Sequence, residues 1–206
     1  MLKISKAQIQ EFNKNGFISL DNFFSKNDFN YTKKKFKKLF YGFYSNKVVP
    51  DKIKWQPGRD KNNIPRSLCN IWKSDRTIAR IILNEKLGFA AAKLMGWKST
   101  RLNQDSIIWV VPNAGCINYH QDDPYQDWHI PRSIITCWIP ITDTTEKSAS
   151  IEYLVGSHRK KISKRRKNFY AKSDYRNIIK NYIKKKESIK VMSLKAGSVV
   201  FHHGKI

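Results

Sequence analysis

Five short segments rich in β-branched and aromatic residues follow one another in the second half of the chain, and they limit the fold more than any other feature. Pro, Gly, Asn and Asp residues separate them, as is typical of strands joined by loops. Short strands at this spacing predict a β-sandwich or barrel, because a sheet must cover its apolar face with another layer. The segments are SIIWVV (106–111), SIITCWIPI (133–141), SASIEYL (148–154), IKVMSL (189–194) and SVVFHH (198–203).

The N-terminal part predicts helices that pack outside these strands. Ser5 and Gln8 have the spacing of a capping box, so a helix is expected over residues 6–15, ending at Gly16. The segment FISL (17–20) then reads as a short strand.

Two further helices and one long loop are expected before the strands. One helix begins near Ser25, and another covers residues 75–95, capped by Ser74 and closed by Gly96. Residues 48–70 contain three Pro and one Gly, which favours an irregular loop, and loops of this length are often lids.

The chain is strongly basic, and much of its charge lies in one segment. The formal net charge is +24, and residues 159–190 hold 14 of the 40 Lys and Arg but only two of the 16 Asp and Glu. We interpret this segment as an insertion in a single domain of 206 residues, with a helical flank and lid loop at 1–99 and a β core at 100–206. No nucleic-acid-binding motif accompanies the charge, which argues against nucleic acid as a partner.

No segment has the length and apolar composition of a membrane span, and the N-terminus does not resemble a signal peptide. We therefore expect a cytoplasmic protein without a membrane span. The oligomeric state is not indicated by any pattern in the sequence.

The segment YHQDDPY (119–125) places His and Asp residues together in this basic chain. His120 and Asp122 are separated by one residue, so their side chains share a face if the segment lies on a strand. An imidazole and a carboxylate side by side supply two of the ligands in a 2-His-1-carboxylate Fe(II) site. The H-x-D spacing alone is a weak signal, because it occurs by chance in many chains.

Several longer segments resemble one known family in the same order along the chain. They are AQIQEFNKNGFISLDNFFS (7–25), RLNQDSIIWVVPNAG (101–115), YHQDDPY, ITCWIPITDTTEKSASIEYLVGSHRK (135–160) and LKAGSVVFHHG (194–204). They resemble, in turn, the opening helix and strand, the stretch before the metal motif, that motif, a strand with an acidic turn and GSH segment, and a late glycine turn of the phytanoyl-CoA dioxygenase family. The members of this family are Fe(II)- and 2-oxoglutarate-dependent oxygenases.

The resemblance implies a mainly β fold with flanking helices: a double-stranded β-helix, or jelly-roll and cupin-like barrel. It implies His120 and Asp122 as metal ligands, no catalytic residue beyond the ligands, and Fe(II), 2-oxoglutarate and O2 as cofactor and co-substrates. The implied enzyme is a 2-oxoglutarate-dependent non-haem iron dioxygenase that hydroxylates an unactivated C–H bond of a small-molecule or acyl substrate. Succinate and CO2 are the co-products. Halogenating relatives lack the carboxylate, so Asp122 favours hydroxylation.

The family's third ligand, a histidine, is expected beyond Ile206, as is an arginine that pairs with 2-oxoglutarate. We therefore expect the last strands of the barrel to be missing and this fragment to have little activity. The competing interpretation takes His202 or His203 as the third ligand, with His203 as the fallback assignment. Trp138 and Gln104 are expected near the co-substrate. Core packing of Trp138 is an equal alternative, and a strand-edge structural role is the preferred interpretation of Gln104.

A second hypothesis belongs to a different class of protein. It is a non-catalytic jelly-roll protein whose basic loop binds a polyanion. His158, in the GSH segment, is expected to brace a loop.

Overall fold

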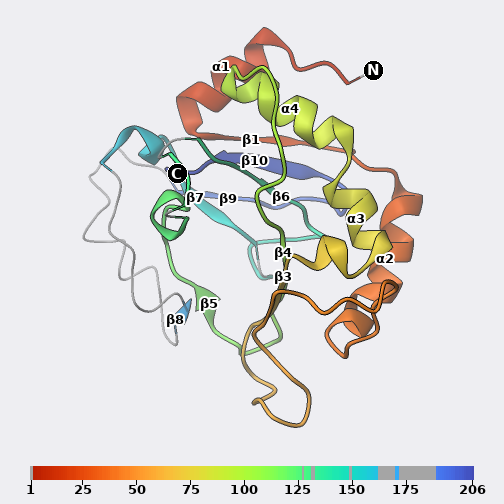
Figure 1. Ribbon diagram of the computed structural model, residues 1–206. Helices are drawn as coiled ribbons and strands as arrows, with labels where there is room; N and C mark the ends of the chain where they lie inside the picture. Colours follow the sequence, from red (N-terminus) through yellow and green to blue (C-terminus); the bar gives the residue numbers. More distant parts are fainter. Residues whose placement is uncertain (1, 127, 131–132, 149, 162–169, 172–188) are drawn as a thin grey trace.

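The computed structural model describes residues 2–126, 128–130, 133–148, 150–161, 170–171 and 189–206 (Figure 1). Most of the basic segment at 159–190 lies outside these residues, so the predicted insertion and its polyanion-binding role are not described. The helices are α1 (Lys6–Asn15), α2 (Lys26–Leu39), α3 (Arg76–Ile82) and α4 (Glu85–Met95), and the 3₁₀ turns are η1 (Ile71–Lys73), η2 (Asp123–Tyr125) and η3 (Ser157–Arg159). None of the described helices has the length and apolar character that a bilayer span requires.

The described strands form four small sheets, and the largest of them positions the site. In that sheet β10 lies between β1 and β6 and is antiparallel to both. In the other sheets β3 lies between β2 and β4, β5 pairs with β8, and β7 pairs with β9. The strands are β1 (Phe17–Leu20), β2 (Lys52–Ile53), β3 (Arg66–Cys69), β4 (Ser106–Trp109), β5 (Cys116–Ile117), β6 (Ile135–Trp138), β7 (Glu152–Leu154), β8 (Tyr170–Ala171), β9 (Ile189–Val191) and β10 (Val199–His203).

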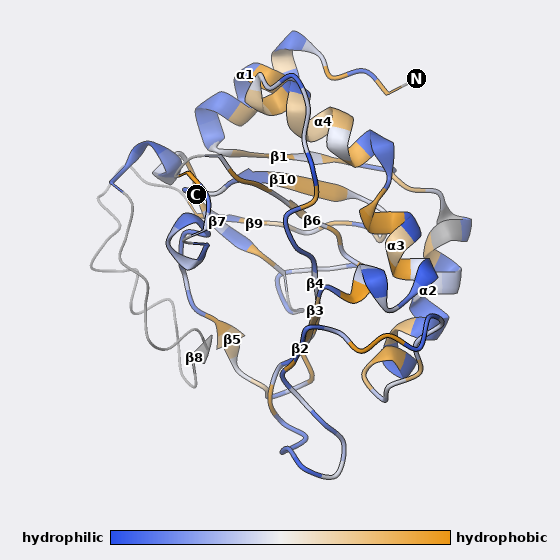
Figure 2. Cartoon of the chain, in the orientation of Figure 1, coloured by the Kyte–Doolittle hydropathy of each residue, from blue (hydrophilic) through white to orange (hydrophobic). Residues whose placement is uncertain are grey.

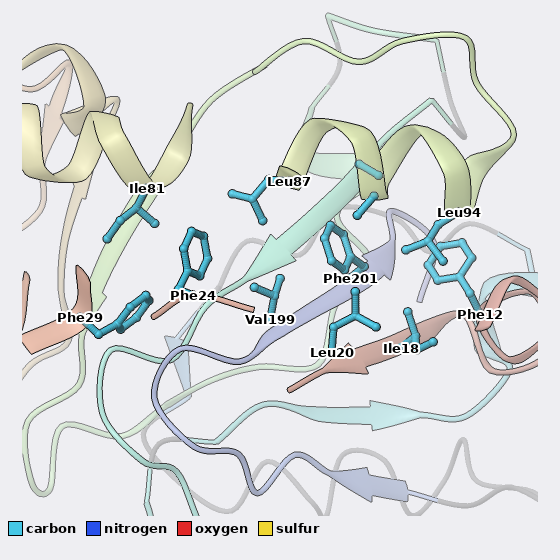
Figure 3. Packing of buried hydrophobic residues seen from close by; sticks show 12 residues of the cluster. Phe12, Ile18, Leu20, Phe24, Phe29, Ile81, Leu87, Leu94, Val199 and Phe201 are labelled. Carbon is cyan, nitrogen blue, oxygen red and sulfur yellow. The ribbon is translucent and has the colours of Figure 1, made fainter. Parts of the chain in front are cut away.

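One face of the β1-β10-β6 sheet packs against helices (Figure 3). Val199 and Phe201 of β10 are fully buried there, in one cluster with Leu87 and Leu94 of α4. Alternation along β10 turns Val200 to the opposite face. Figure 2 shows that these strands are mostly hydrophobic, whereas the loop that joins β2 to β3 is hydrophilic.

The opposite face of the sheet is covered by a second layer of strands. Phe17 of β1 and Val200 of β10 pack in one cluster with Tyr153 of β7 and with Met192 and Leu194, which follow β9. The β1-β10-β6 sheet is therefore buried on both faces, and the His202 side chain, which alternates with Phe201, lies on this inner face.

The predicted start of the chain is confirmed in detail. The backbone N–H of Gln8 donates to Ser5 Oγ and the backbone N–H of Ser5 donates to Gln8 Oε1, so both halves of the capping box form. Helix α1 ends at Gly16, whose φ of 85° is the left-handed conformation that glycine adopts most readily. Strand β1 follows at once.

The prediction of one helix over residues 75–95 is wrong, because two helices occupy this range. The Asn84 side chain accepts from the backbone N–H of Lys86 and starts α4, so α3 ends at Ile82. The first cap is Asp75 and not Ser74, since its carboxylate accepts from the N–H groups of Thr77 and Ile78. The apolar stripe continued through the break and concealed it.

The prediction of an irregular loop over residues 48–70 is also wrong in part. Strands β2 and β3 lie in this range, and β3 pairs with β4. Arg66 and Leu68 of β3 are buried and alternate with the half-buried Ser67 and Cys69, which is the pattern of a strand. Pro50, before β2, and Pro57, Gly58 and Pro65, between β2 and β3, are typical of loops and led to the prediction of an irregular segment.

The buried carboxylate of Asp105, just before β4, connects this strand to η1. Its Oδ1 accepts from the backbone N–H of Trp72, and its own N–H donates to Asn70 Oδ1. Burial raises the pKa of the Asp105 carboxyl from 3.8 to about 6, although the backbone N–H groups that it accepts lower it in part. The folded state therefore binds more protons than the unfolded state at mildly acidic pH.

Replacing Phe201 by Ala should lower the free energy of unfolding by about 3–5 kcal/mol, because it empties the centre of the core. Phe43→Ala is the matched control: Phe43 is 65% exposed, so its truncation should change stability by about 0.5 kcal/mol or less. Urea unfolding measures both variants. Equal losses in the two would contradict the assignment of Phe201 to the core.

Asp105→Asn should remove a pH-dependent loss of stability. A carboxyl with a raised pKa in the folded state destabilises the fold as pH rises from about 4 through 6, since the unfolded chain ionises more readily. Between pH 4.5 and 7.5 the variant should therefore gain about 2 kcal/mol relative to the natural protein. Urea unfolding at the two pH values tests this, and a difference that stays constant with pH would contradict it.

Candidate metal centre

The segment that carries His120 and Asp122 leaves β5 and enters η2 without forming a strand itself. Two contacts fasten it to the chain after β10. The backbone N–H of Asp123 donates to Gly204 O at 2.9 Å, and Gln121 Nε2 donates to Lys205 O at 2.5 Å. Gln121 and Asp123 are thus used for attachment, while His120 and Asp122 face each other.

Gly204 allows this close approach. A Cβ atom on Gly204 would lie 2.2 Å from Asp123 Oδ1 and 3.1 Å from Ile134 Cβ. The Gly204 N–H donates to Ile134 O at 3.1 Å, so the chain after β10 binds both the motif and the residue before β6. A larger residue at this position would separate the motif from the sheet.

His120 has a defined tautomer. Its Nδ1 lies 2.7 Å from the backbone O of Asn118, which can only accept, so Nδ1 carries the proton in the neutral ring. Nε2 then presents its lone pair to Asp122 Oδ1 at 3.3 Å. Two acceptors facing each other require a proton or a metal ion between them, and this fits the donor set of an Fe(II) site.

Asp122 uses its two oxygens differently. Oδ1 faces His120, whereas Oδ2 accepts from Thr136 Oγ1 at 2.6 Å and lies 3.1 Å from His202 Nε2. Burial by itself raises the pKa of the Asp122 carboxyl, but the contacts with His120 and His202 outweigh it and hold the pKa well below its ordinary value. The carboxylate is therefore ionised at neutral pH.

Tyr153 contacts the His202 nitrogen that faces away from Asp122. The hydroxyl of Tyr153 lies 2.7 Å from His202 Nδ1, and the ring of Phe17 stacks on Tyr153 with 4.4 Å between centroids. Burial raises the pKa of Tyr153 well above its ordinary value, so its hydroxyl keeps its proton. Residues from β1, β7 and β10 thus meet behind Asp122.

Trp138 and Gln104 are the two residues predicted to lie near the co-substrate. Trp138 lies on the same face of β6 as Thr136 and packs against the inner-face cluster of Tyr153 and Val200, so core packing is part of its role. Gln104 is exposed in the segment that leads into β4. Its neighbour Asn103 accepts from Trp128 Nε1 at 3.0 Å, so this segment lies beside the chain that follows the motif.

The structure brings His202, and not His203, to Asp122. The His203 ring instead lies 5.7 Å from the ring of His158, and its Nδ1 accepts from the backbone N–H of Lys205. His158 Nε2 lies 3.1 Å from Asn13 O in the last turn of α1, as expected for a residue that braces a loop. His129 Nδ1 lies 3.0 Å from Ile130 O.

Among the described residues, no group of three His, Cys, Asp or Glu side chains is arranged to hold a single ion. His120 and His202 approach different oxygens of Asp122. Thr136, Tyr153 and the orientation of His202 were missed in the sequence because they come from three distant strands. The alternation of His202 with Phe201 along an apolar strand was the one available signal.

Comparisons with known proteins give the family. The sequence model of the family "Phytanoyl-CoA dioxygenase (PhyH)" matches residues 12–206. No curated protein matches the chain.

Several solved structures are similar to the chain. SnoK, a non-heme alpha-ketoglutarate-dependent carbocyclase from nogalamycin biosynthesis, has 17% identity and a TM-score of 0.71, with 98% of this chain and 75% of SnoK covered. EctD from S. alaskensis with bound Fe has 18% identity and a TM-score of 0.73, with 98% and 69% covered. AviO1 from Streptomyces viridochromogenes Tue57 has 16% identity and a TM-score of 0.63, with 100% and 86% covered.

At these identities the structural likeness shows a shared fold, and the family match carries the assignment. Another EctD structure contains 2-oxoglutarate and 5-hydroxyectoine. Because the family model covers residues 12–206, the chain belongs to the phytanoyl-CoA dioxygenase family, the non-haem iron oxygenases that depend on Fe(II), 2-oxoglutarate and O2.

Proposed function

We propose that this protein hydroxylates an unactivated C–H bond of a small-molecule or acyl substrate, with His120 and Asp122 as two ligands of the iron. The observation that carries the proposal is the 3.3 Å approach of His120 Nε2 to Asp122 Oδ1. The carbonyl of Asn118 favours the neutral tautomer whose lone pair is on Nε2, as in many metal-binding histidines. The two side chains are 23% and 21% exposed, so an ion and a small molecule can reach them.

The fold proposed for this function is a jelly-roll barrel, or double-stranded β-helix. The β1-β10-β6 sheet supplies one wall, and β7 with β9 supplies part of the facing wall, since Val200 and Tyr153 share one cluster. The candidate metal centre lies at one end of this cluster, where the chain turns after β10.

Iron with 2-oxoglutarate and O2 supplies the oxidising chemistry, with succinate and CO2 as co-products. The contribution of the chain is positioning. His120 offers one nitrogen, Asp122 offers one oxygen and balances charge, and Thr136 holds the other oxygen in place. Because Asp122 would fill a coordination position that halogenating relatives leave to halide, hydroxylation is the proposed outcome.

The substrate is proposed to be a small or acyl molecule that approaches past the chain after the motif. Trp128 is 59% exposed and Ile130 is 79% exposed, and the Trp128 indole is held by Asn103. These side chains suit an apolar part of a substrate. A third ligand beyond Ile206, or His203 in its place, stays a prediction, as do the contacts of Trp138 and Gln104 with 2-oxoglutarate.

Anaerobic addition of Fe(II) and 2-oxoglutarate should produce the weak visible charge-transfer band of an iron-bound 2-oxo acid. His120→Ala and Asp122→Ala should abolish this band and weaken Fe(II) binding by more than the roughly 100-fold that loss of a partner outside the ligands can cost. Asp143→Ala is the control, because Asp143 is an exposed carboxylate paired with Lys195. Persistence of the band in both ligand variants would reject this site.

A further inference from the structure

We propose that His202 is a positioning residue for Asp122 and not a metal ligand, and that Tyr153 sets its tautomer. This proposal rests on the proposed function, because it assigns the two oxygens of the Asp122 ligand to different tasks. Oδ1 is left for the metal, and Oδ2 is held by the protein. The hydrogen-bonding capacity of the groups around His202 distinguishes the two oxygens.

The chain of contacts from Tyr153 to Asp122 has one consistent arrangement of protons. The Asp122 carboxylate can only accept, so the 3.1 Å contact requires His202 Nε2 to carry a proton. In the neutral ring Nδ1 is then an acceptor, and it faces the Tyr153 hydroxyl at 2.7 Å, which donates to it. With a proton on Nε2, the nitrogen closest to the site has no lone pair for a metal.

His120 shows the opposite arrangement. Its Nδ1 donates to the Asn118 carbonyl, so in the neutral ring the lone pair lies on Nε2, the atom that faces Asp122. The hydrogen-bond partner of Nδ1 therefore differs between His120 and His202, and it decides whether each ring presents a lone pair or a proton to Asp122. A carbonyl behind His120 makes it a ligand, whereas a hydroxyl behind His202 makes it a donor.

The sheet places the donors to Oδ2 with little freedom. His202 of β10 is directly opposite Thr136 of β6 and directly opposite Phe17 of β1. Thr136 and His202 both contact Oδ2, and Phe17 stacks on Tyr153. One cross-strand row thus holds the carboxylate, and the His202 side chain within it is only 8% exposed.

This arrangement has a consequence for the metal. With Oδ2 held by two donors, Asp122 offers a single oxygen and occupies a single coordination position. A carboxylate free to rotate would bind with both oxygens and block a position that 2-oxoglutarate or O2 requires. We therefore expect loss of His202 to weaken metal binding without removing an imidazole from the metal.

The tautomers are measured directly in the metal-free protein. Two-bond ¹H–¹⁵N correlation spectra of the uniformly ¹⁵N-labelled chain distinguish the two forms of each ring, and His120→Gln and His202→Gln assign the signals. We expect a proton on Nδ1 of His120 and on Nε2 of His202. A proton on Nδ1 of His202 with a bare Nε2 would overturn the proposal, and this result does not depend on whether metal binds.

Tyr153→Phe tests the origin of the tautomer. Loss of the hydroxyl should reduce the excess of the Nε2-protonated form of His202 and weaken Co(II) binding by roughly 10-fold. Tyr44→Phe is the matched control, because Tyr44 is a partly buried tyrosine in a different hydrophobic cluster. An unchanged His202 tautomer in Tyr153→Phe would show that Tyr153 does not set it.

Metal binding separates a positioning role from a ligand role. His202→Leu should weaken Co(II) binding by roughly 10-fold to 100-fold, and His202→Gln, whose amide can donate to Oδ2, should recover part of this loss. Pulsed EPR of bound Cu(II), which detects coordinated imidazoles through their remote nitrogens, should show the same number of imidazoles in both variants as in the natural chain. Loss of one imidazole in His202→Gln would overturn the proposal.

The same titrations test the proposed function separately. His120→Gln should remove an imidazole from bound Cu(II) and weaken Co(II) binding more than His202→Gln does. If His120→Gln and Asp122→Asn left binding unchanged, the ligand pair of the proposed function would be wrong. His158→Gln is the control histidine, since its ring contacts α1 and the side chain of His203.

Discussion

The Asp122 carboxylate is the group on which the rest of the site depends. Burying a carboxylate costs several kcal/mol unless donors and opposite charges surround it. Here Thr136 and His202 contact one oxygen and His120 faces the other. The two histidines hold the pKa of Asp122 low despite burial, so the negative charge that a metal site requires is maintained. The fold supplies each of these partners from a different element.

The register of the β1-β10-β6 sheet makes this possible. Phe17, His202 and Thr136 stand opposite one another in adjacent strands, and a shift of one residue in β10 would turn His202 to the helical face. The opposite face is fixed by Val199 and Phe201, which are buried against α4 (Figure 3). The same packing that stabilises the core therefore decides which histidine reaches the site, and it places His202 and not His203 beside Asp122.

Local signals in the sequence predicted the parts of the structure that local interactions decide. The capping box of Ser5 and Gln8, the Gly16 helix end and the pairing of His120 with Asp122 required only a few neighbouring residues. The break at Asn84 was concealed because the apolar stripe continued across it. Thr136 and Tyr153 could not be predicted as partners of the site, because only strand register and sheet stacking bring them there.

The central claim is that the two oxygens of Asp122 have separate tasks, one toward the metal and one toward the protein. Anomalous diffraction from anaerobic crystals loaded with Fe(II) tests it most directly. The account predicts one iron peak bonded to His120 Nε2 and Asp122 Oδ1, while Oδ2 keeps its contacts with Thr136 and His202. A peak bonded to His202 Nε2 or to Asp122 Oδ2, or one away from His120, would contradict it.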